Sequence, residues 1–314
     1  MGSSSFVWCG NVSYTCLSQV NPVVDREIAA VSANSSDPRD AGSARVSEED
    51  ERHILEVSSV ESTTVSTQPL DDIRDEVRRV LEAAEARGVT LRVLGGVAVF
   101  LHSPSASHRA LQRVYRDADF VGLSAQKRAI EALFADLGYQ ADREFNTLHG
   151  HQRLFFWDPL HERQIDVFLD QLRMCHTLDF RGRLERDRWT LPLADLLLTK
   201  LQIWEANEKD LIDIVALLHD HPLGYGDEET IDIRRIVDVL STDWGWYRTA
   251  KENVDRVRTL ILERELADEF VSLRRLEELW RAVEEAPKSR AWKLRAMIGE
   301  RKRWYELPEE VRRD

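Results

Sequence analysis

The first stretch with a regular hydrophobic period lies at 71–81, where apolar residues recur every three or four positions behind an acidic first turn. This pattern is typical of an amphipathic helix. A short apolar strand is predicted at 91–94, and a double glycine turns it into a second helix at 97–101. Alternating side chains at 115–121 predict another strand, and residues 124–137 predict a further amphipathic helix.

The pattern changes in the second half of the chain. Residues 139–190 are rich in predicted strands, and the pattern becomes helical after Pro192, a residue that suits the first turn of a helix. The predicted strands are 152–157, 164–169 and 175–180. The predicted helices are 193–206 and 208–219, with three or four more from Glu228 onward. We therefore expect an α+β fold, a mixed sheet with flanking helices followed by a helical C-terminal module.

Three segments are expected along the chain. Residues 1–68 are rich in Ser, Thr, Asn and Val and keep no period, which predicts a disordered N-terminal extension. The mixed α+β domain is expected at 69–222 and the helical module at 223–314. With 314 residues and 36.3 kDa, the chain is long enough for two domains or for one domain with an extension.

Charge and cysteine content narrow the classes of function and location. A net charge of -13 argues against a broad, sequence-blind nucleic-acid binder, which needs a basic face, but allows a nucleic acid held at one local patch. The three cysteines lack metal-type spacing, which indicates a reducing compartment. Neither a signal peptide nor a membrane span is recognisable, so we expect a cytoplasmic protein with no membrane partner.

Two aspartates one residue apart carry the strongest chemical signal. Asp117 and Asp119 lie in the strand predicted at 115–121, and because side chains alternate along a strand, both are expected on one face. Adjacent carboxylates repel each other, and a divalent cation between them removes that repulsion. Mg²⁺ takes such ligands, commonly one or two carboxylates together with substrate phosphates. The alternative is a pair of solvated acids on an edge strand.

A third acid, Asp166, interrupts the apolar strand predicted at 164–169. A buried carboxylate without a partner is costly, so Asp166 must meet a cation, a donor network or a metal. If this strand lies beside that of Asp117, three carboxylates converge, and Asp166 could also accept the proton of an attacking hydroxyl. The alternative is an ion pair with Arg153 or Arg163.

Gly95 and Gly96 stand at the predicted strand-to-helix junction. A helix N-terminus offers free N–H groups and a positive dipole end, which suit a phosphate. Glycine also lets a ligand approach the backbone closely. The alternative is a plain tight turn between the strand and the helix.

Lys200 falls within the apolar stripe of the helix predicted at 193–206. On the next helix, Asp213 lies on the apolar side and Asp210 one turn earlier, behind Asn207, which is a good helix cap. Lys200 is expected either to pair with Asp210 or Asp213 and hold the two helices together, or to reach a triphosphate while one of these acids orients it. Both roles are compatible.

Taken in order, these residues resemble the DNA polymerase beta-type nucleotidyltransferase superfamily. The matching segments are Leu94-Gly95-Gly96, Arg113 to Phe120, and Ile165-Asp166-Val167. The later segments, Leu198 to Leu201 and Glu208 to Ile214, resemble the branch that holds AbiEii-like abortive-infection toxins and other minimal bacterial nucleotidyltransferases. The likeness covers roughly residues 72–222.

The resemblance implies a small mixed sheet with flanking helices and a role for each matching residue. The residues it places at the metal, Mg²⁺ or Mn²⁺, and in catalysis are Asp117, Asp119 and Asp166. The residues it places around the NTP are Gly95, Gly96, Arg113, Lys200, Asp210 and Asp213. The spacing from Gly96 to Asp117 is longer than in compact members of the superfamily, which leaves the phosphate geometry open.

Two functions from different classes are consistent with this reasoning. The first is a nucleotidyltransferase that moves an NMP from an NTP to a hydroxyl of an RNA end, a protein or a small molecule. A toxin-like role, which brings in an antitoxin partner, favours tRNA or protein as acceptor, and the acidic balance favours a small molecule. The second is a non-catalytic module of the same fold that binds nucleotide or a partner protein. Acids at all three positions favour the enzyme.

Overall fold

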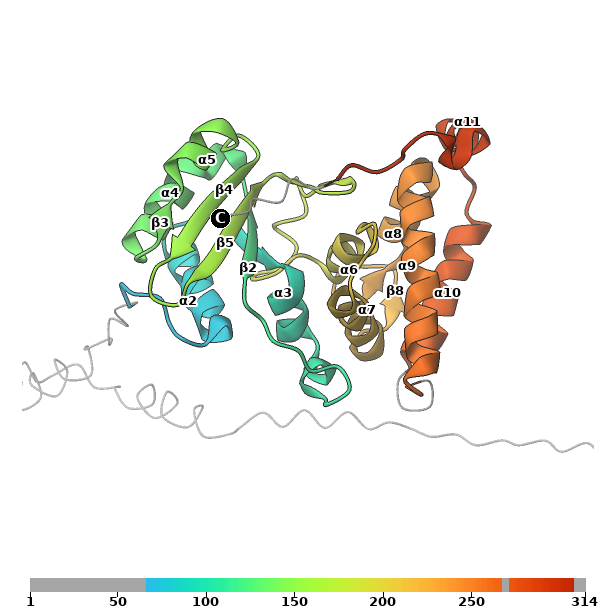
Figure 1. Cartoon of the computed structure of the whole chain (residues 1–314), viewed down its shortest axis with the longest axis horizontal. Coiled ribbons are helices and arrows are strands. Elements are labelled where there is room, and N and C mark those ends of the chain that lie inside the picture. The colour runs from blue at the N-terminus through green and yellow to red at the C-terminus, as the bar shows by residue number, and fades with distance from the viewer. Residues whose placement is uncertain (1–65, 267–270, 308–314) are drawn as a thin grey trace, which may run out of the picture. The chain divides into compact units, whose positions relative to one another are not determined.

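The computed structural model describes residues 66–266 and 271–307 (Figure 1). The extension predicted at 1–68 therefore lies outside the described residues, except for its last three positions, and so does the helix break expected at Pro308. No helix within the described part of the chain is long and apolar enough to cross a membrane.

A five-stranded mixed sheet organises the first half of the described chain, in the order β1-β2-β5-β4-β3. Its strands are β1 (Leu91–Leu94), β2 (Ala118–Gly122), β3 (Gln140–Ala141), β4 (Arg153–Asp158) and β5 (Arg163–Leu169). β2 runs parallel to β5, and the other neighbours are antiparallel. The expected mixed sheet is thus confirmed.

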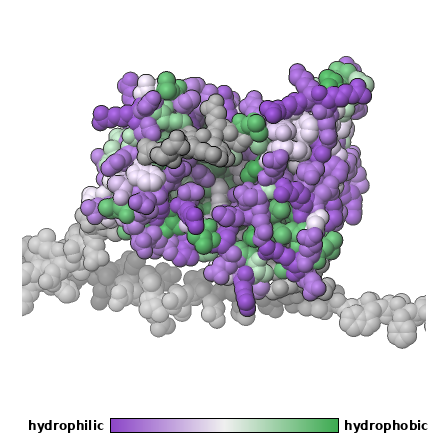
Figure 2. Space-filling model, in the orientation of Figure 1, coloured by the Kyte–Doolittle hydropathy of each residue, from purple (hydrophilic) through white to green (hydrophobic). Residues whose placement is uncertain are grey.

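Apolar burial holds the helices on this sheet. Phe120, Leu154 and Ile165 lose nearly all of their accessible surface, because one face of each strand packs under the helices. The face of the molecule shown in Figure 2 is mostly hydrophilic, and its hydrophobic residues occur in small, separate groups. The hydrophobic side chains of the described residues therefore gather mainly in one core.

Short helices flank the sheet. They are α2 (Ile73–Ala86), α3 (Gly95–His102), α4 (Lys127–Asp136) and α5 (Arg143–Leu148). The helix predicted at 71–81 is confirmed as α2, which Asp72 caps, and the one at 124–137 is confirmed as a short turn, η2 (Ser124–Gln126), continued by α4. α5 was not expected, because six residues are too few to show a clear period.

The strand predicted at 175–180 is confirmed in a shorter form, β7 (Thr177–Asp179). It pairs in a hairpin with a short strand that was not expected, β6 (Gln171–Arg173). The turn between them buries Cys175 and His176, and burial of the turn explains why this stretch looks as apolar as a strand. His176 accepts or donates a hydrogen bond with Thr249 at 2.8 Å, which ties the hairpin to helix α9.

The later part of the described chain is helical, apart from a two-residue strand pair, β8 (Leu223–Gly224) and β9 (Ile231–Asp232). Its helices are α6 (Leu193–Leu201), α7 (Glu208–Asp220), α8 (Ile233–Thr242), α9 (Trp244–Glu263), α10 (Ser272–Glu285) and α11 (Arg290–Ile298). α7 packs on α9 and α10, and α6 packs on α8 and α9 (Figure 1). These contacts cross the domain boundary expected at residue 222, and that boundary stays a prediction.

The helix predicted at 193–206 ends earlier, at Leu201. The chain then turns through Glu205, whose φ of 62° lies in the left-handed region. This turn brings Asn207 into place to cap α7, where its side chain accepts a hydrogen bond from the backbone N–H of Asp210 at 3.2 Å. The cap of the second helix therefore sets the end of the first.

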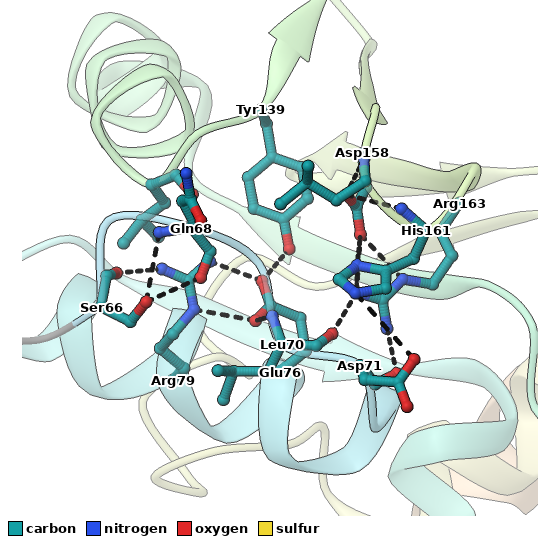
Figure 3. A network of polar contacts seen from close by, with 12 residues as sticks. Ser66, Gln68, Leu70, Asp71, Glu76, Arg79, Tyr139, Asp158, His161 and Arg163 are labelled. Atoms are coloured by element: carbon teal, nitrogen blue, oxygen red, sulfur yellow. Dashed lines mark hydrogen bonds and ion pairs between the residues drawn. The ribbon is translucent and has the colours of Figure 1, made fainter.

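A buried polar network fixes the segment that leads into α2 (Figure 3). Glu76 and Arg79 form an ion pair at 2.6 Å with almost no exposure, and the Tyr139 hydroxyl donates a hydrogen bond to the same Glu76 carboxylate. A second pair, Asp158 with Arg163 at 2.6 Å, joins the β4–β5 turn to this segment, because Arg163 also donates to the backbone carbonyl of Asp71 at 3.0 Å. Each buried charge thus has a partner.

Replacing Tyr139 by Phe is expected to lower the free energy of unfolding by about 1–3 kcal/mol, because Glu76 loses a buried donor. Tyr247→Phe is a matched control, since its hydroxyl donates to the exposed Glu284 at 2.8 Å, where water can replace it. Urea unfolding of both variants measures the difference. Equal losses in the two variants would show that the network adds nothing to the stability of the fold.

Candidate functional site

Asp119 and Asp166 lie directly opposite each other on the parallel strands β2 and β5. The same register places Ala118 beside Ile165 and Phe120 beside Val167, which are buried. The apolar positions of both strands thus fix the pairing, because a slip by one residue would turn their core side chains outward. The two carboxylates are brought together by the hydrophobic pattern around them.

Asp117 differs from the prediction. β2 begins at Ala118, so Asp117 precedes the strand and is exposed, and strand alternation does not place it. The pairing of β2 with β1 ends at Asp119, opposite Leu94, and its pairing with β5 begins one residue earlier, at Ala118 opposite Ile165, so Asp117 pairs with neither strand. Asp117 nevertheless lies near the other acids. Although its side chain is exposed, neighbouring atoms displace part of its water, and this desolvation, followed by the Asp166 carboxylate, raises its pKa above the ordinary value.

Of the three carboxylates at this edge of the sheet, only that of Asp166 has a cationic partner among the described residues. Burial, and next the Asp166 carboxylate, raise the pKa of Asp119 to about 7. Asp166 itself accepts a hydrogen bond from the Nε atom of Arg153 at 2.6 Å, so the ion pair with Arg153 that the sequence left open is present. Arg163, the other possible partner, pairs with Asp158. Among the described residues, none donates a hydrogen bond to the carboxylate of Asp117 or Asp119.

This donor set can be tested against the expected metal. In the described part of the chain, no group of three or more His, Cys, Asp or Glu side chains is placed to hold a metal ion by itself. Mg²⁺ does not need such a cage, because it is commonly held by one or two carboxylates together with substrate phosphates. Among the residues that the structure describes, Asp117 and Asp119 have no ion partner, and their charged forms are destabilised, so they fit a cation that arrives with a substrate.

The glycine pair borders both the acids and a guanidinium group. Gly95 adopts a φ of 73°, and a Cβ atom there would lie 2.8 Å from the Oδ2 atom of Asp119. A Cβ atom at Gly96 would lie 1.5 Å from the Nη2 atom of Arg113. Gly95 therefore favours glycine through its backbone conformation, and a side chain at Gly96 would displace the Arg113 guanidinium, which supports more than a plain tight turn. The backbone at the start of α3 is open to close approach.

Gly95→Ala is expected to cost about 1–2 kcal/mol of folding free energy, because an alanine at positive φ is strained, and to displace the Asp119 carboxylate. Gly88→Ala is its control: Gly88 has a φ of 66° but no atom within 4 Å of a Cβ atom. Thermal melting should show similar losses of stability for both. Only Gly95→Ala should weaken the binding of a nucleoside triphosphate, and equal binding by the two variants would contradict this.

Lys200 joins α6 to α7 through two carboxylates. Its Nζ atom lies 2.9 Å from Asp210 and 2.8 Å from Asp213, and the lysine is buried. Burial works against the charged lysine, but Asp213 and Asp210 outweigh it and raise the pKa of Lys200 above the ordinary value. Arg113 completes the group, since its Nε and Nη2 atoms each donate to Asp213 at 2.9 Å. The helix-joining ion pair expected from the sequence is thus present.

Two cavities meet at these residues. The smaller, of about 240 Å³, is bordered by Gly96, Arg113 and Asp117. The larger, of about 680 Å³, runs along β4, β5 and the β6–β7 hairpin, and its size is that of a small-molecule site. The residues that line both cavities are Asp119, Lys200, Asn207 and Asp210. All the residues predicted for the site except Asp166 and Asp213 line at least one cavity, and those two contact lining residues.

Several side chains of the larger cavity were not expected. Phe145, Phe168 and Arg173 line it, and so does Leu307, near the end of the described chain. Arg153 was considered only as an ion partner of Asp166, although it lines the cavity as well. The sequence offered one signal for this group: apolar and basic residues occur together in β4 and in β5, the strand of Asp166.

A scan against protein-family models finds no match, and no curated protein matches this chain. Among solved structures, the chain is similar to the lincomycin-bound lincosamide antibiotic adenylyltransferase LnuA, with 16% identity, 48% of this chain and 97% of that chain covered, and a TM-score of 0.34. It is similar to the antibiotic-resistance factor ANT(2'')-Ia, with 14% identity, 62% and 92% coverage, and a TM-score of 0.28.

A third similar structure is an antigenic nucleotidyltransferase-like protein from Paracoccidioides brasiliensis. The identity is 13%, the coverage is 71% of this chain and 97% of that chain, and the TM-score is 0.34. These identities and TM-scores are too low to assign a family or an activity. The case for a function therefore depends on the site.

Proposed function

We propose that this protein is a metal-dependent nucleotidyltransferase, which moves an NMP from an NTP to a hydroxyl acceptor. One observation carries the proposal: Asp119 and Asp166 are opposite one another on paired strands, and the glycine turn that begins α3 touches Asp119. A fold that needed only stability would gain nothing from two uncompensated acids, Asp117 and Asp119, at this edge.

The nucleotide would be held by residues of both halves of the described chain. Mg²⁺ or Mn²⁺ held by Asp117 and Asp119 would neutralise charge on the transferring phosphate. The backbone of Gly95 and Gly96 would donate N–H groups to the triphosphate. Lys200 is buried beside the smaller cavity and would add a positive charge there, as the sequence predicted.

Two acids would hold in place the positively charged side chains beside the triphosphate, Lys200 and Arg113. Asp210 and Asp213 hold Lys200, and Asp213 also holds Arg113. Since both carboxylates are already engaged, we assign them to orientation of these two cations. Arg113 lies against the site of a Cβ atom at Gly96, so it can contribute to phosphate binding at the same turn.

The transfer step needs an oxygen nucleophile and a place for its proton. The acceptor oxygen would attack the α-phosphorus of the NTP, the bond from that phosphorus to the bridging oxygen would break, and pyrophosphate would leave. Asp166, which contacts the cavity through Arg153, would accept the proton of the acceptor hydroxyl. The larger cavity, which runs along β5 on this side, would take the acceptor, and the smaller one the triphosphate.

Thermal melting with each NTP, with and without Mg²⁺, tests the binding half of this proposal. A triphosphate that requires Mg²⁺ should raise Tm in the wild type and not in Asp117→Ala. Incubation with labelled NTPs and total cell extract tests the transfer half, since label should enter one fraction: RNA, protein or small molecules. No stabilisation by any NTP and no uptake of label would exclude the enzyme.

The alternative is a non-catalytic module that binds nucleotide or a partner protein. The observation in its favour is the ion pair of Arg153 with Asp166, because a carboxylate that already has a cation needs no metal. Metal-independent stabilisation by a nucleotide, with no label transferred, would favour this function. The AbiEii-like role and an antitoxin partner stay predictions from the resemblance.

A further inference from the structure

The guanidinium group of Arg153 lines the larger cavity, and only one of its three nitrogens donates a hydrogen bond to another described residue. Its Nε atom donates to Asp166 at 2.6 Å, and neither of its terminal nitrogens donates a hydrogen bond to any other described residue. The side chain is 28% exposed and lines the cavity. A guanidinium carries five donors in a planar fork, so most of its hydrogen-bonding capacity is available to a ligand.

Two aromatic rings hold this guanidinium in place. The Cζ atom of Arg153 lies 5.2 Å from the ring centre of Phe168 and 5.8 Å from that of Phe145. Both rings line the same cavity. Contact with the rings and the bond to Asp166 restrict the rotamers of Arg153, which lowers the entropy lost when its free donors bind a ligand.

A second arginine, Arg173, lies on the same wall. Arg173 is exposed on β6 at this cavity, and its guanidinium donates only to the amide oxygen of Gln171, at 3.2 Å and 3.0 Å, with no acidic partner among the described residues. Away from Asp119 and Asp210, Glu306 is the one acid that lines this cavity in the described chain. Such a wall disfavours a polycationic acceptor.

We infer that the acceptor is a small hydroxyl compound that carries an oxyanion, a carboxylate or a phosphate, and an apolar or aromatic body. The inference rests on the proposed nucleotidyl transfer. The terminal nitrogens of Arg153 bind the oxyanion as a fork, and the body lies against Phe145 and Phe168. Because Nε of the same guanidinium holds Asp166, the oxyanion and the proton acceptor are fixed by one side chain.

This arrangement makes Arg153 both a binding residue and a positioning residue. An acceptor held by its oxyanion presents its hydroxyl beside Asp166, so recognition and orientation occur together. Two arginines, Arg153 and Arg173, line a cavity that also holds the acids Asp119, Asp210 and Glu306, and so few cations suit a single oxyanion and not a row of phosphates. A small compound is therefore favoured over an RNA end.

Three compounds with one body and different charges test the inference: para-hydroxymethyl benzoate, the neutral para-hydroxymethyl benzyl alcohol and the cationic para-hydroxymethyl benzylamine. Their dissociation constants are measured by ligand-observed NMR with the full chain, without nucleotide. The benzoate should bind roughly tenfold or more tightly than the alcohol, and the amine most weakly. The corresponding phosphonate shows whether phosphate-like groups bind better than carboxylate.

Variants of Arg153 test whether this side chain causes the preference for the benzoate. Arg153→Gln should remove the roughly tenfold advantage of the benzoate while the neutral alcohol binds as before, and Arg153→Lys should retain part of it. Arg128→Gln is a matched control, because Arg128 is exposed on α4 and does not line this cavity. Equal binding of the three compounds, or an order unchanged in Arg153→Gln, would overturn the inference.

The two proposals fail in different ways. An intact Mg²⁺-dependent stabilisation by NTP without any anion preference counts against the acceptor class alone. An intact anion preference without stabilisation by NTP counts against nucleotidyl transfer. A short oligoribonucleotide that binds more tightly than the benzoate, with a steep dependence on salt, would show several phosphate contacts and overturn the small-molecule acceptor.

Discussion

Asp119→Asn is expected to lower the rate of nucleotidyl transfer by about 10²–10³-fold or more, because the side chain loses the charge that would hold the cation at the transferring phosphate. The same variant should no longer be stabilised by NTP with Mg²⁺. The rate is measured as pyrophosphate release with saturating acceptor. Asp136→Asn, an exposed carboxylate paired with Arg87 on the surface, should leave both readouts unchanged.

Although Asp119→Asn should lower the rate of transfer, it should raise the free energy of unfolding of the metal-free protein. Asp119 has a pKa of about 7 in the folded protein and an ordinary value near 3.8 when unfolded. The folded state thus binds its proton more tightly, so stability falls as the pH rises from about 4 to about 7 and stays low above that. Asparagine removes this loss, and metal-free Asp119→Asn should be more stable than the wild type at pH 8, by on the order of 1–4 kcal/mol.

Urea unfolding in EDTA at pH 8 and at pH 4 measures this gain, which should shrink to less than about 1 kcal/mol at the lower pH, because the carboxyl group is then protonated in the folded state and only partly ionised in the unfolded state. A residue whose removal stabilises the protein and abolishes activity is kept for function. If Asp119→Asn instead lowers stability at pH 8, the carboxylate has a favourable partner in the fold, and the metal site proposed here is wrong.

The sequence predicted those elements whose periodicity is local. α2 and α4 have apolar faces that repeat along the helix, and β5 is an apolar run broken only by Asp166 from Ile165 to Leu169, so each could be recognised without its neighbours. The first residue of β2 could not be predicted, because it depends on where the pairing with β5 begins. The end of α6 could not be predicted either, since Glu205 and the cap at Asn207 determine it.

The same distinction holds for the site. Asp119 stood out because only one residue separates it from Asp117, and Asp166 stood out because a charge inside an apolar strand is costly wherever the strand lies. Lys200 stood out for the same reason on its helix. Arg153 and Arg173 did not, because a basic residue beside an aromatic one is common on solvent-exposed strands. Their role depends on a cavity formed by β4, β5, the β6–β7 hairpin and residues near Leu307, which are distant in sequence.

Lys200→Met is expected to lower the free energy of unfolding by about 3–5 kcal/mol, because it leaves two buried carboxylates with one fewer cation. Lys251→Met is the matched control. Lys251 pairs with Asp255 at 2.8 Å on the surface of α9, with both side chains more than 40% exposed, and should cost about 0.5 kcal/mol or less. Urea unfolding of the two variants gives the comparison.

A double variant separates the structural role of Lys200 from its role at the nucleotide. In Lys200→Met with Asp210→Asn, the remaining acid, Asp213, keeps the two hydrogen bonds from Arg113, so the charges balance again. Much of the lost stability should return, whereas Mg²⁺-dependent stabilisation by NTP should stay weak, because the cation beside the smaller cavity is absent. If NTP binding returns together with stability, Lys200 only joins the two helices, and the phosphate charge must be met by Arg113 and the backbone of α3.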